Sequence, residues 1–372
     1  MKIPSLPLDV FIGLTNRCNL RCQHCNVSTT RDVKDEMSTA ELKNLIAELS
    51  RRKIFKLVLT GGEPFVREDI FEILDFIQEQ PLRFSINTNA TLLNESSARR
   101  LTTNRRRDGI LVSLDGSNSS VHDRLRGDGA FERGLRGLQH LVRFAREKIT
   151  IFTVVTKYNL NDLENIAALV DSLGISSLRL EPLMYSGNGL LNREVLALDA
   201  TEMIFVYETV KRLRDRYGPL IGGSYLDMGE KFRNWQHETA AEGGKGGEMY
   251  NCAGAVTKLV IRPDGWITPC DRLWDLKLGN LRTQSLEDIW LRAEPTKYFR
   301  ERFTRTVDER EECKECAHRS DCHGGCPAVG YYAGEGILGL DPSSCYKIYQ
   351  EARETYERVC INDNIFQCNP AL

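Results

Sequence analysis

Three cysteines fall within eight residues near the beginning of the chain, namely Cys18, Cys22 and Cys25 in the stretch LTNRCNLRCQHCN (14–26). A structural tetrahedral metal site takes four protein ligands, and an iron–sulfur cube also takes four thiolates. The next cysteine is Cys252, more than two hundred residues farther along. The spacing therefore indicates a cluster site that lacks one protein ligand and leaves a metal position open. The alternative is a zinc loop completed by a distant ligand such as Cys252.

A second group of cysteines lies in the last third of the chain. Disulfide frameworks are typical of small secreted chains, whereas this chain has 372 residues and begins without a signal-peptide pattern. Bound metal is therefore the better explanation, and it would hold together a segment with little apolar periodicity. The group comprises Cys252, Cys270, Cys313, Cys316, Cys322, Cys326 and Cys345, and Cys360 and Cys368 follow in the tail.

Polar residues also follow several strand-like runs. In TGGEPF (60–65), Gly61 and Gly62 allow a close approach to the backbone, and Glu63 could receive an ammonium group. Glycine and proline are also ordinary in a strand-to-helix turn, which is the simpler interpretation. Three further candidates that could hold a sugar are Asn89 in NTNA (87–90) and Ser113 and Asp115 in SLDG (113–116).

The elements that must position these residues alternate along the first half of the chain. Short runs rich in valine, isoleucine and leucine predict buried strands, and segments with apolar residues three and four apart predict helices. Strands are expected over 8–14, 55–60, 82–88, 109–115, 149–156 and 176–183, and helices over 38–49, 68–79, 130–147 and 162–173. This series predicts an α/β fold, an open partial (β/α)6 barrel like part of a TIM barrel, with its chemistry at the carboxyl ends of the strands.

The pattern changes after an expected helix near 200–217. Residues 218–250 are rich in glycine and are expected to form a loop-like linker. We therefore expect a core at 1–217, a linker at 218–250, a cysteine-rich domain at 251–345, and a tail at 346–372 that carries most of a last helix over 344–359.

Composition excludes several classes of protein. The chain has 50 lysines and arginines against 52 aspartates and glutamates, a formal net charge of −2, so no nucleic-acid partner is indicated. No apolar stretch is long enough for a spanning helix, so no membrane partner is expected. The cytoplasm is the expected compartment.

The cysteine triplet, with His24 before Cys25 and GGEP one strand later, resembles the radical S-adenosylmethionine (radical SAM) superfamily over residues 8–215. The resemblance implies that the triplet binds a [4Fe-4S] cluster and that SAM chelates its open iron. It further implies that Glu63 holds the amino group of SAM and that Arg126, in RLRGDG (124–129), meets its carboxylate. Asn89, Ser113 and Asp115 would complete the cofactor site.

The second group of cysteines resembles the SPASM extension of such enzymes, an iron–sulfur domain with two auxiliary [4Fe-4S] clusters. By this resemblance, one auxiliary cluster is bound by Cys252, Cys270 and Cys326, and the other by Cys313, Cys316, Cys322 and Cys345. A zinc ribbon is the alternative for four of these cysteines.

Two features of this segment bear on mechanism. Sulfatase-maturating relatives have one more cysteine upstream of the position of Cys252, where this chain reads EGGKGGEMYN, so the fourth ligand of the first auxiliary cluster is open, non-cysteine, or Cys360 or Cys368. PCDRLWDLKLGNL (269–281) resembles the segment in which those relatives carry a proposed base, so Asp271 is the candidate proton acceptor. Alternatively, Asp271 only orders its loop or pairs with Arg272 or Lys277.

The resemblance implies a radical SAM oxidoreductase that cleaves SAM to a 5′-deoxyadenosyl radical and abstracts a hydrogen atom from its substrate. The favoured substrate is a peptide or protein side chain that becomes oxidised or cross-linked. A dehydrogenase or epimerase acting on a sugar, aminocyclitol or haem precursor is the second interpretation, and a zinc-binding protein without chemistry is a remote third. Flavodoxin or ferredoxin is the expected electron donor.

Overall fold

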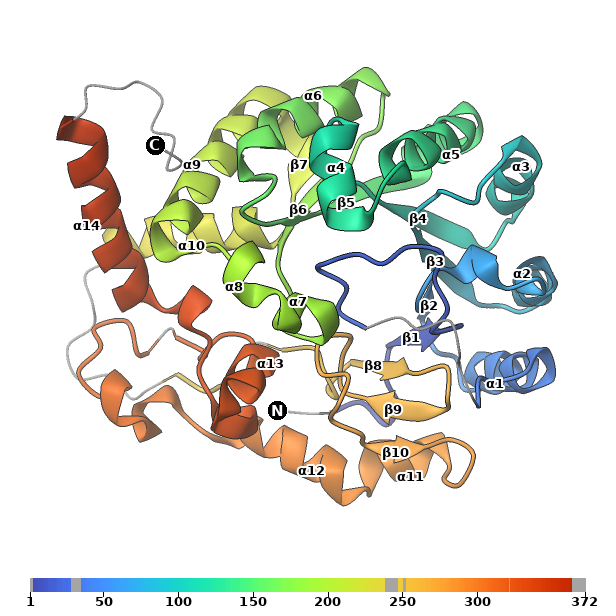
Figure 1. Ribbon diagram of the computed structural model, residues 1–372. Helices are drawn as coiled ribbons and strands as arrows, with labels where there is room; N and C mark the ends of the chain where they lie inside the picture. Colours follow the sequence, from blue (N-terminus) through green and yellow to red (C-terminus); the bar gives the residue numbers. More distant parts are fainter. Residues whose placement is uncertain (1–2, 28–34, 238–246, 250–251, 321, 363–372) are drawn as a thin grey trace.

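The computed structural model describes residues 3–27, 35–237, 247–249, 252–320 and 322–362 (Figure 1). Its strands form one sheet in the order β10-β9-β8-β1-β2-β3-β4-β5-β6-β7. The strands are β1 (Asp9–Gly13), β2 (Lys56–Thr60), β3 (Arg83–Thr88), β4 (Arg107–Ser113), β5 (Ile149–Val155), β6 (Leu178–Pro182), β7 (Ile221–Gly222), β8 (Lys258–Ile261), β9 (Trp266–Thr268) and β10 (Gly279–Asn280).

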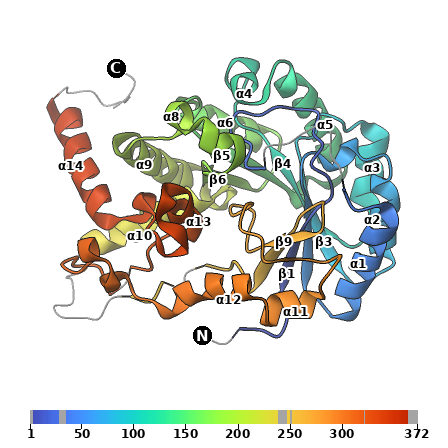
Figure 2. The same ribbon diagram turned by 60° about the horizontal axis from the view of Figure 1, so that its bottom comes forward.

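Strands β1 to β6 pair in parallel and in sequence order, as expected from the alternating pattern. The crossover helices lie around the outside of the curved sheet, which forms an open, partial barrel (Figure 2). They are α1 (Thr39–Arg51), α2 (Ile70–Gln78), α3 (Glu95–Thr103), α4 (Ser119–Arg126), α5 (Ala130–Ala145), α6 (Leu163–Ser172) and α9 (Ala200–Tyr217). The predicted fold class is therefore confirmed.

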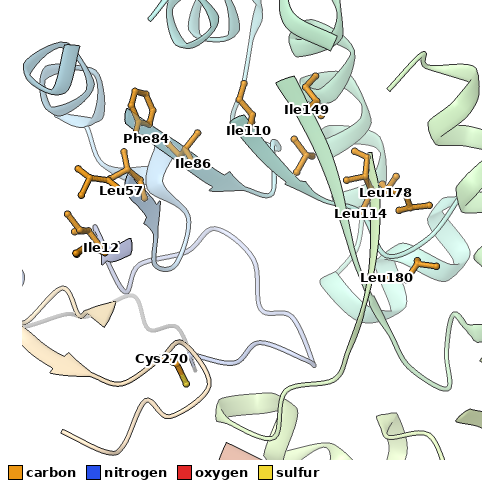
Figure 3. Close-up of a cluster of buried hydrophobic side chains, with 14 of the residues drawn as sticks. Ile12, Leu57, Phe84, Ile86, Ile110, Leu114, Ile149, Leu178, Leu180 and Cys270 are labelled. Carbon is orange, nitrogen blue, oxygen red and sulfur yellow. The ribbon is translucent and has the colours of Figure 1, made fainter. Parts of the chain in front are cut away.

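The core of the barrel lies between the sheet and these helices. Ile12, Leu57, Phe84 and Ile110 come from four successive strands and are fully buried (Figure 3). Burying side chains of this size stabilises the fold by about 1.5–3 kcal/mol each. The carboxyl ends of the same strands lie outside this core, so the residues that follow them can be polar.

The expected linker over 218–250 is wrong in its first part. The chain there forms β7 (Ile221–Gly222), paired with β6, and the helix α10 (Ser224–His237). Gly222 and Gly223 indicate a loop, but Gly223 has a φ of +106° and passes so close to β6 that a Cβ would lie 2.5 Å from the backbone of Leu180. Residues 238–246 and 250–251 lie outside the described residues.

The cysteine-rich segment continues the sheet of the barrel. Strand β8 pairs in parallel with β1, and the antiparallel β8–β9 hairpin carries the sheet onward to β10. Beyond it the chain makes short elements and then a last helix: α11 (Leu286–Leu291), α12 (Glu294–Glu301), α13 (Pro327–Gly330) and α14 (Tyr346–Asn362) (Figure 1). Two more short helices, α7 (Gly187–Leu191) and α8 (Arg193–Leu196), lie beside the loop of the cysteine triplet.

The described residues contain no helix with both the length and the apolar character that a membrane crossing requires.

Candidate functional site

The cysteine triplet lies on the loop that follows β1, and neighbouring loops fix this loop on several sides. The amide of Gly62 donates to Thr15 O at 2.6 Å, and the amide of Glu63 donates to Arg17 O at 2.9 Å. On the other side, the Asn188 side chain donates to Cys22 O at 3.0 Å. The loop is therefore held in place before any cofactor arrives.

The two glycines of GGEP are required by this contact between loops. A Cβ on Gly61 would lie 2.3 Å from Thr15 O, and a Cβ on Gly62 would lie 2.1 Å from Arg17 O. Gly61 also has a φ of +129°, which side chains disfavour. The backbone that approaches these glycines is thus the triplet loop, and a further contact with the cofactor stays a prediction.

Glu63 is buried, and its carboxylate accepts three hydrogen bonds. The donors are Thr88 Oγ1 at 2.7 Å, the Asn89 amide at 2.7 Å and the Phe65 amide at 3.2 Å. Burial raises the pKa of Glu63 to about 7, against the lowering effect of these donors. An added ammonium group would therefore favour its charged form.

Arg126 is the last residue of α4 and lies next to the triplet. Its Nη1 is 3.9 Å from Cys22 Sγ, and its Nε donates to Asp115 Oδ2 at 2.5 Å. Asp115 is fully buried, and its Oδ2 is also 3.1 Å from His24 Nε2. Burial alone would raise the pKa of Asp115, but Arg126 and His24 hold it well below its usual value. Because its carboxylate is taken up by protein partners, Asp115 acts on Arg126, and its predicted contact with a sugar stays untested.

A cavity of about 450 Å³ opens at the carboxyl ends of the strands. Its wall includes the three cysteines of the triplet and most of the predicted cofactor residues, namely Gly61, Gly62, Glu63, Asn89, Ser113 and Arg126. Asn89 also approaches the triplet directly, with Nδ2 3.9 Å from Cys18 Sγ. The structure thus brings together the residues that the sequence indicated singly.

A second cavity, of about 470 Å³, lies between the barrel and the cysteine-rich segment. Cys252, Cys270 and Cys326 line it, although 74 residues separate the first from the last. Three tyrosines, Tyr185, Tyr207 and Tyr225, also line it.

Lys258, Asp271 and Arg272 line both cavities and so form a wall between them. Lys258 Nζ lies 2.6 Å from Asp271 Oδ1, and Arg272 Nη1 lies 3.9 Å from Cys326 Sγ. Burial alone would raise the pKa of Asp271, but Lys258 lowers it below its usual value. The ion-pair partner of Asp271 is thus Lys258, and neither of the alternatives considered from sequence, Arg272 or Lys277, forms an ion pair with it.

The remaining cysteines of the segment form a third group. Cys313, Cys316, Cys322 and Cys345 lie near enough for their charges to interact. Burial raises the pKa of Cys313 to about 11 and that of Cys270 to about 12. A metal that binds Cys313 or Cys270 must therefore displace a proton.

The donor sets consist of thiols, which are the ligands that iron–sulfur clusters take. All ten cysteines whose side chains are described are free thiols. Within the described ranges, no three His, Cys, Asp or Glu side chains surround a position that one metal ion could occupy. In a cube each thiolate binds a different iron, so the thiols stand farther apart than around zinc. Main-chain amides already point at three sulfurs, from Leu20 to Cys18, from Gly254 to Cys252 and from Gly324 to Cys322.

Some relevant residues gave no signal in the sequence, and others cannot be placed. Glu181, the residue before the last of β6, lies in the first cavity, where it binds Ser224 Oγ and Arg179, and Lys258 begins β8. In the sequence, neither residue can be told from an ordinary strand residue. Cys368 lies outside the described residues, and Cys360 is described only in its backbone, near the end of α14.

Comparison with known proteins gave two family matches. Residues 12–170 match the radical SAM superfamily, and residues 252–317 match the SPASM iron–sulfur cluster-binding domain. The chain is 31% identical to mycofactocin maturase MftC of Mycobacterium ulcerans (strain Agy99), over 95% of this chain and 91% of the maturase. It is 30% identical to an AdoMet-dependent heme synthase of Methanosarcina barkeri (strain Fusaro), over 93% of this chain and 99% of the synthase.

Among solved structures, the chain resembles SuiB of Streptococcus suis bound to the precursor peptide SuiA. The TM-score is 0.73 at 19% identity, and the match covers 92% of this chain and 76% of SuiB. At this identity the likeness concerns the fold.

Proposed function

Because this chain belongs to the radical SAM superfamily and carries a SPASM domain, we propose that it oxidises or cross-links a side chain of a peptide or protein substrate, as in the maturation of ribosomally made peptides. It is a radical SAM/SPASM oxidoreductase, and its cofactors are [4Fe-4S] clusters, auxiliary ones included, and SAM. The observation that carries the proposal is the pair of cavities separated by Lys258, Asp271 and Arg272.

The first cavity provides the site of hydrogen abstraction. Cys18, Cys22 and Cys25 would hold the cluster, and Glu63 and Arg126 would bind the amino and carboxylate groups of SAM. When bound, the reduced cluster and SAM supply a 5′-deoxyadenosyl radical, which takes a hydrogen atom from an unactivated C–H bond. Asp115 holds Arg126 in place, and Asn89 and Ser113 would contact the nucleoside from neighbouring strand ends.

The shared wall provides the site of oxidation. A substrate that reaches it lies between the triplet and Cys252, Cys270 and Cys326, which would hold the first auxiliary cluster. Asp271 would accept the proton that the oxidised substrate releases, and a cluster held by these three cysteines would supply an acceptor for the electron. Lys258 keeps Asp271 ionised before the proton arrives. Cys313, Cys316, Cys322 and Cys345 would hold the second auxiliary cluster.

A peptide substrate is supported by the similarity to a maturase over nearly the whole chain. The SuiB fold, moreover, accommodates a precursor peptide. The test is anaerobic turnover of the reconstituted enzyme with SAM, a low-potential reductant and candidate precursor peptides. We expect 5′-deoxyadenosine and a peptide lighter by two hydrogen atoms in mass spectrometry. Release of 5′-deoxyadenosine with no change in any peptide, but with a small molecule consumed, would contradict the proposal.

A haem precursor is the second candidate substrate, because the heme synthase of Methanosarcina barkeri aligns over 99% of its length at 30% identity. The same assay with porphyrin-type carboxylates in place of peptides separates the two. For the electron donor, we propose flavodoxin or ferredoxin, which can be compared by the rate at which each supports release of 5′-deoxyadenosine.

A further inference from the structure

Arg302 is a fully buried arginine with an unusual set of partners. It follows α12 directly, and its exposed fraction is 0%. Its guanidinium donates to main-chain carbonyls of Ile337 at 2.6 Å, Gly339 at 3.0 Å, Gly324 at 3.2 Å and Gly325 at 3.4 Å. Within the part of the chain that the structure describes, no carboxylate lies within 4.0 Å of it.

A buried charge without an opposite charge is costly. Carbonyl groups are neutral dipoles and compensate only part of the lost hydration. The acidic groups that couple electrostatically to Arg302 are the thiols of Cys252, Cys326 and Cys322 and the carboxyl group of Asp341, which lies beyond ion-pair distance. A free thiol is neutral, whereas a thiolate bound to iron is negative, so the partner that this guanidinium lacks is a ligated cluster.

The position of Arg302 relates it to both auxiliary groups of cysteines. Gly324 and Gly325 lie between Cys322 and Cys326, and a Cβ on Gly324 would come within 3.0 Å of Arg302 Nη2. Cys326 lines the second cavity with Cys252 and Cys270, whereas Cys322 interacts with Cys316 and Cys345. The guanidinium therefore holds the short segment at which the two groups meet.

We propose that Arg302 is the shared counter-ion of the two auxiliary clusters. This inference rests on the ligand sets proposed above, but not on the identity of the substrate. Each cluster becomes more negative on reduction, so a fixed cation between them stabilises both reduced forms and raises both reduction potentials. Arg302 is a positioning residue, because it acts on the ligand loop and its charge, and does not contact the substrate.

The experiment compares full-length, anaerobically reconstituted Arg302→Met and Arg302→Lys with the wild type. Methionine removes the charge at similar volume, and lysine keeps the charge without the planar fork. Arg282→Met is the matched control, since Arg282 is partly exposed and pairs with Glu41. Iron and sulfide are counted per chain, and the reduction potentials are measured by electron paramagnetic resonance without any peptide. Addition of SAM identifies the signal of the first cluster, which changes shape.

We expect Arg302→Met to lower the reduction potentials of both auxiliary clusters, whose signals do not respond to SAM, by at least about 59 mV. For one electron, this shift corresponds to a tenfold change in the ratio of oxidised to reduced cluster. Arg302→Lys should keep both near the wild-type values, and the SAM-sensitive signal should not move in any variant. Loss of both auxiliary clusters in Arg302→Met, with both kept in Arg302→Lys, would also support the proposal.

Three results would overturn it: potentials unchanged in Arg302→Met, a shift of only one auxiliary signal, or the same shift or loss in Arg302→Lys. Because the potentials are measured without any peptide, they do not depend on the substrate, so failure of this proposal is distinguishable from failure of the proposed function, which the turnover assay tests.

Discussion

Asp115 Oδ2 and Arg126 Nε lie 2.5 Å apart in a buried ion pair that links the end of β4 to the end of α4. The same guanidinium reaches Cys22 Sγ at 3.9 Å. The position of the arginine relative to the triplet is therefore set by a carboxylate that does not line either cavity.

Asp115→Asn should weaken both folding and binding of SAM. Removing one partner of a buried ion pair leaves the other charge uncompensated, at a cost of about 3 kcal/mol. We therefore expect the free energy of unfolding by denaturant to fall by about 3 kcal/mol. The affinity for SAM, measured by equilibrium binding to the unreduced enzyme, should fall at least tenfold. Asp108→Asn is the control, because its partner Arg83 is 69% exposed. Unchanged SAM affinity in Asp115→Asn would show that Arg126 needs no such anchor.

Glu63→Gln should remove a pH dependence of SAM binding. The pKa of Glu63 is raised by burial to about 7, so its carboxylate is ionised above that pH and protonated below it. Affinity for SAM, whose amino group would donate to this carboxylate, should therefore rise between about pH 6 and about pH 8 in the wild type and stay flat and weaker in Glu63→Gln. Glu68→Gln, in the same loop but exposed, should behave as wild type. A wild-type affinity that is flat over this range would contradict the assignment.

Gly62→Ala should prevent binding of the first cluster and leave the auxiliary clusters in place. The new methyl group would collide with Arg17 O at 2.1 Å and displace the triplet loop. With three clusters in the wild type, iron per chain should fall by roughly one third, and release of 5′-deoxyadenosine should cease. Gly222→Ala is the control, because a Cβ there meets nothing within 4 Å. Full iron content in Gly62→Ala would show that the loop tolerates the shift.

Asp271→Asn should separate hydrogen abstraction from oxidation. If Asp271 takes the released proton, the variant still produces 5′-deoxyadenosine, but oxidised product falls at least tenfold. Asp275→Asn, an exposed aspartate in the same segment, is the control. If both variants formed equal amounts of oxidised product, Asp271 would not be the proton acceptor, and its role would be limited to its contact with Lys258. The measurement is mass spectrometry of both products from one reaction.

Much of the barrel follows from the sequence because its signals are local. Each strand from β1 to β6 lies within two residues of its expected limits, since a short run of buried aliphatic residues leaves few alternatives. The helices α3 and α4 were not predicted, because their apolar faces are narrow; in α3 only Ala98 and Leu101 are buried. The pairing of β8 with β1 joins segments about 250 residues apart, which local patterns do not indicate.

The residues of the candidate site likewise fall into those that the sequence predicts and those that it does not. The cysteines and Glu63 stand in recognisable spacings, and the structure brings them to common cavities. Arg302 and Lys258 have no such spacing, because the carbonyls that bind Arg302 belong to later loops and Lys258 meets Asp271 only through the β8–β9 hairpin. For such residues, function depends on a neighbourhood that only the folded chain creates.

The parallel pairing of β1 with β8 also bears on how the molecule is made. At the ribosome, the first strand appears long before residues 258–261 exist, and until then one of its edges has no partner. An unpaired edge of this kind invites association with other chains. We therefore expect a fragment that stops before β8 to aggregate, so the amino-terminal catalytic half should be produced together with its iron-rich extension.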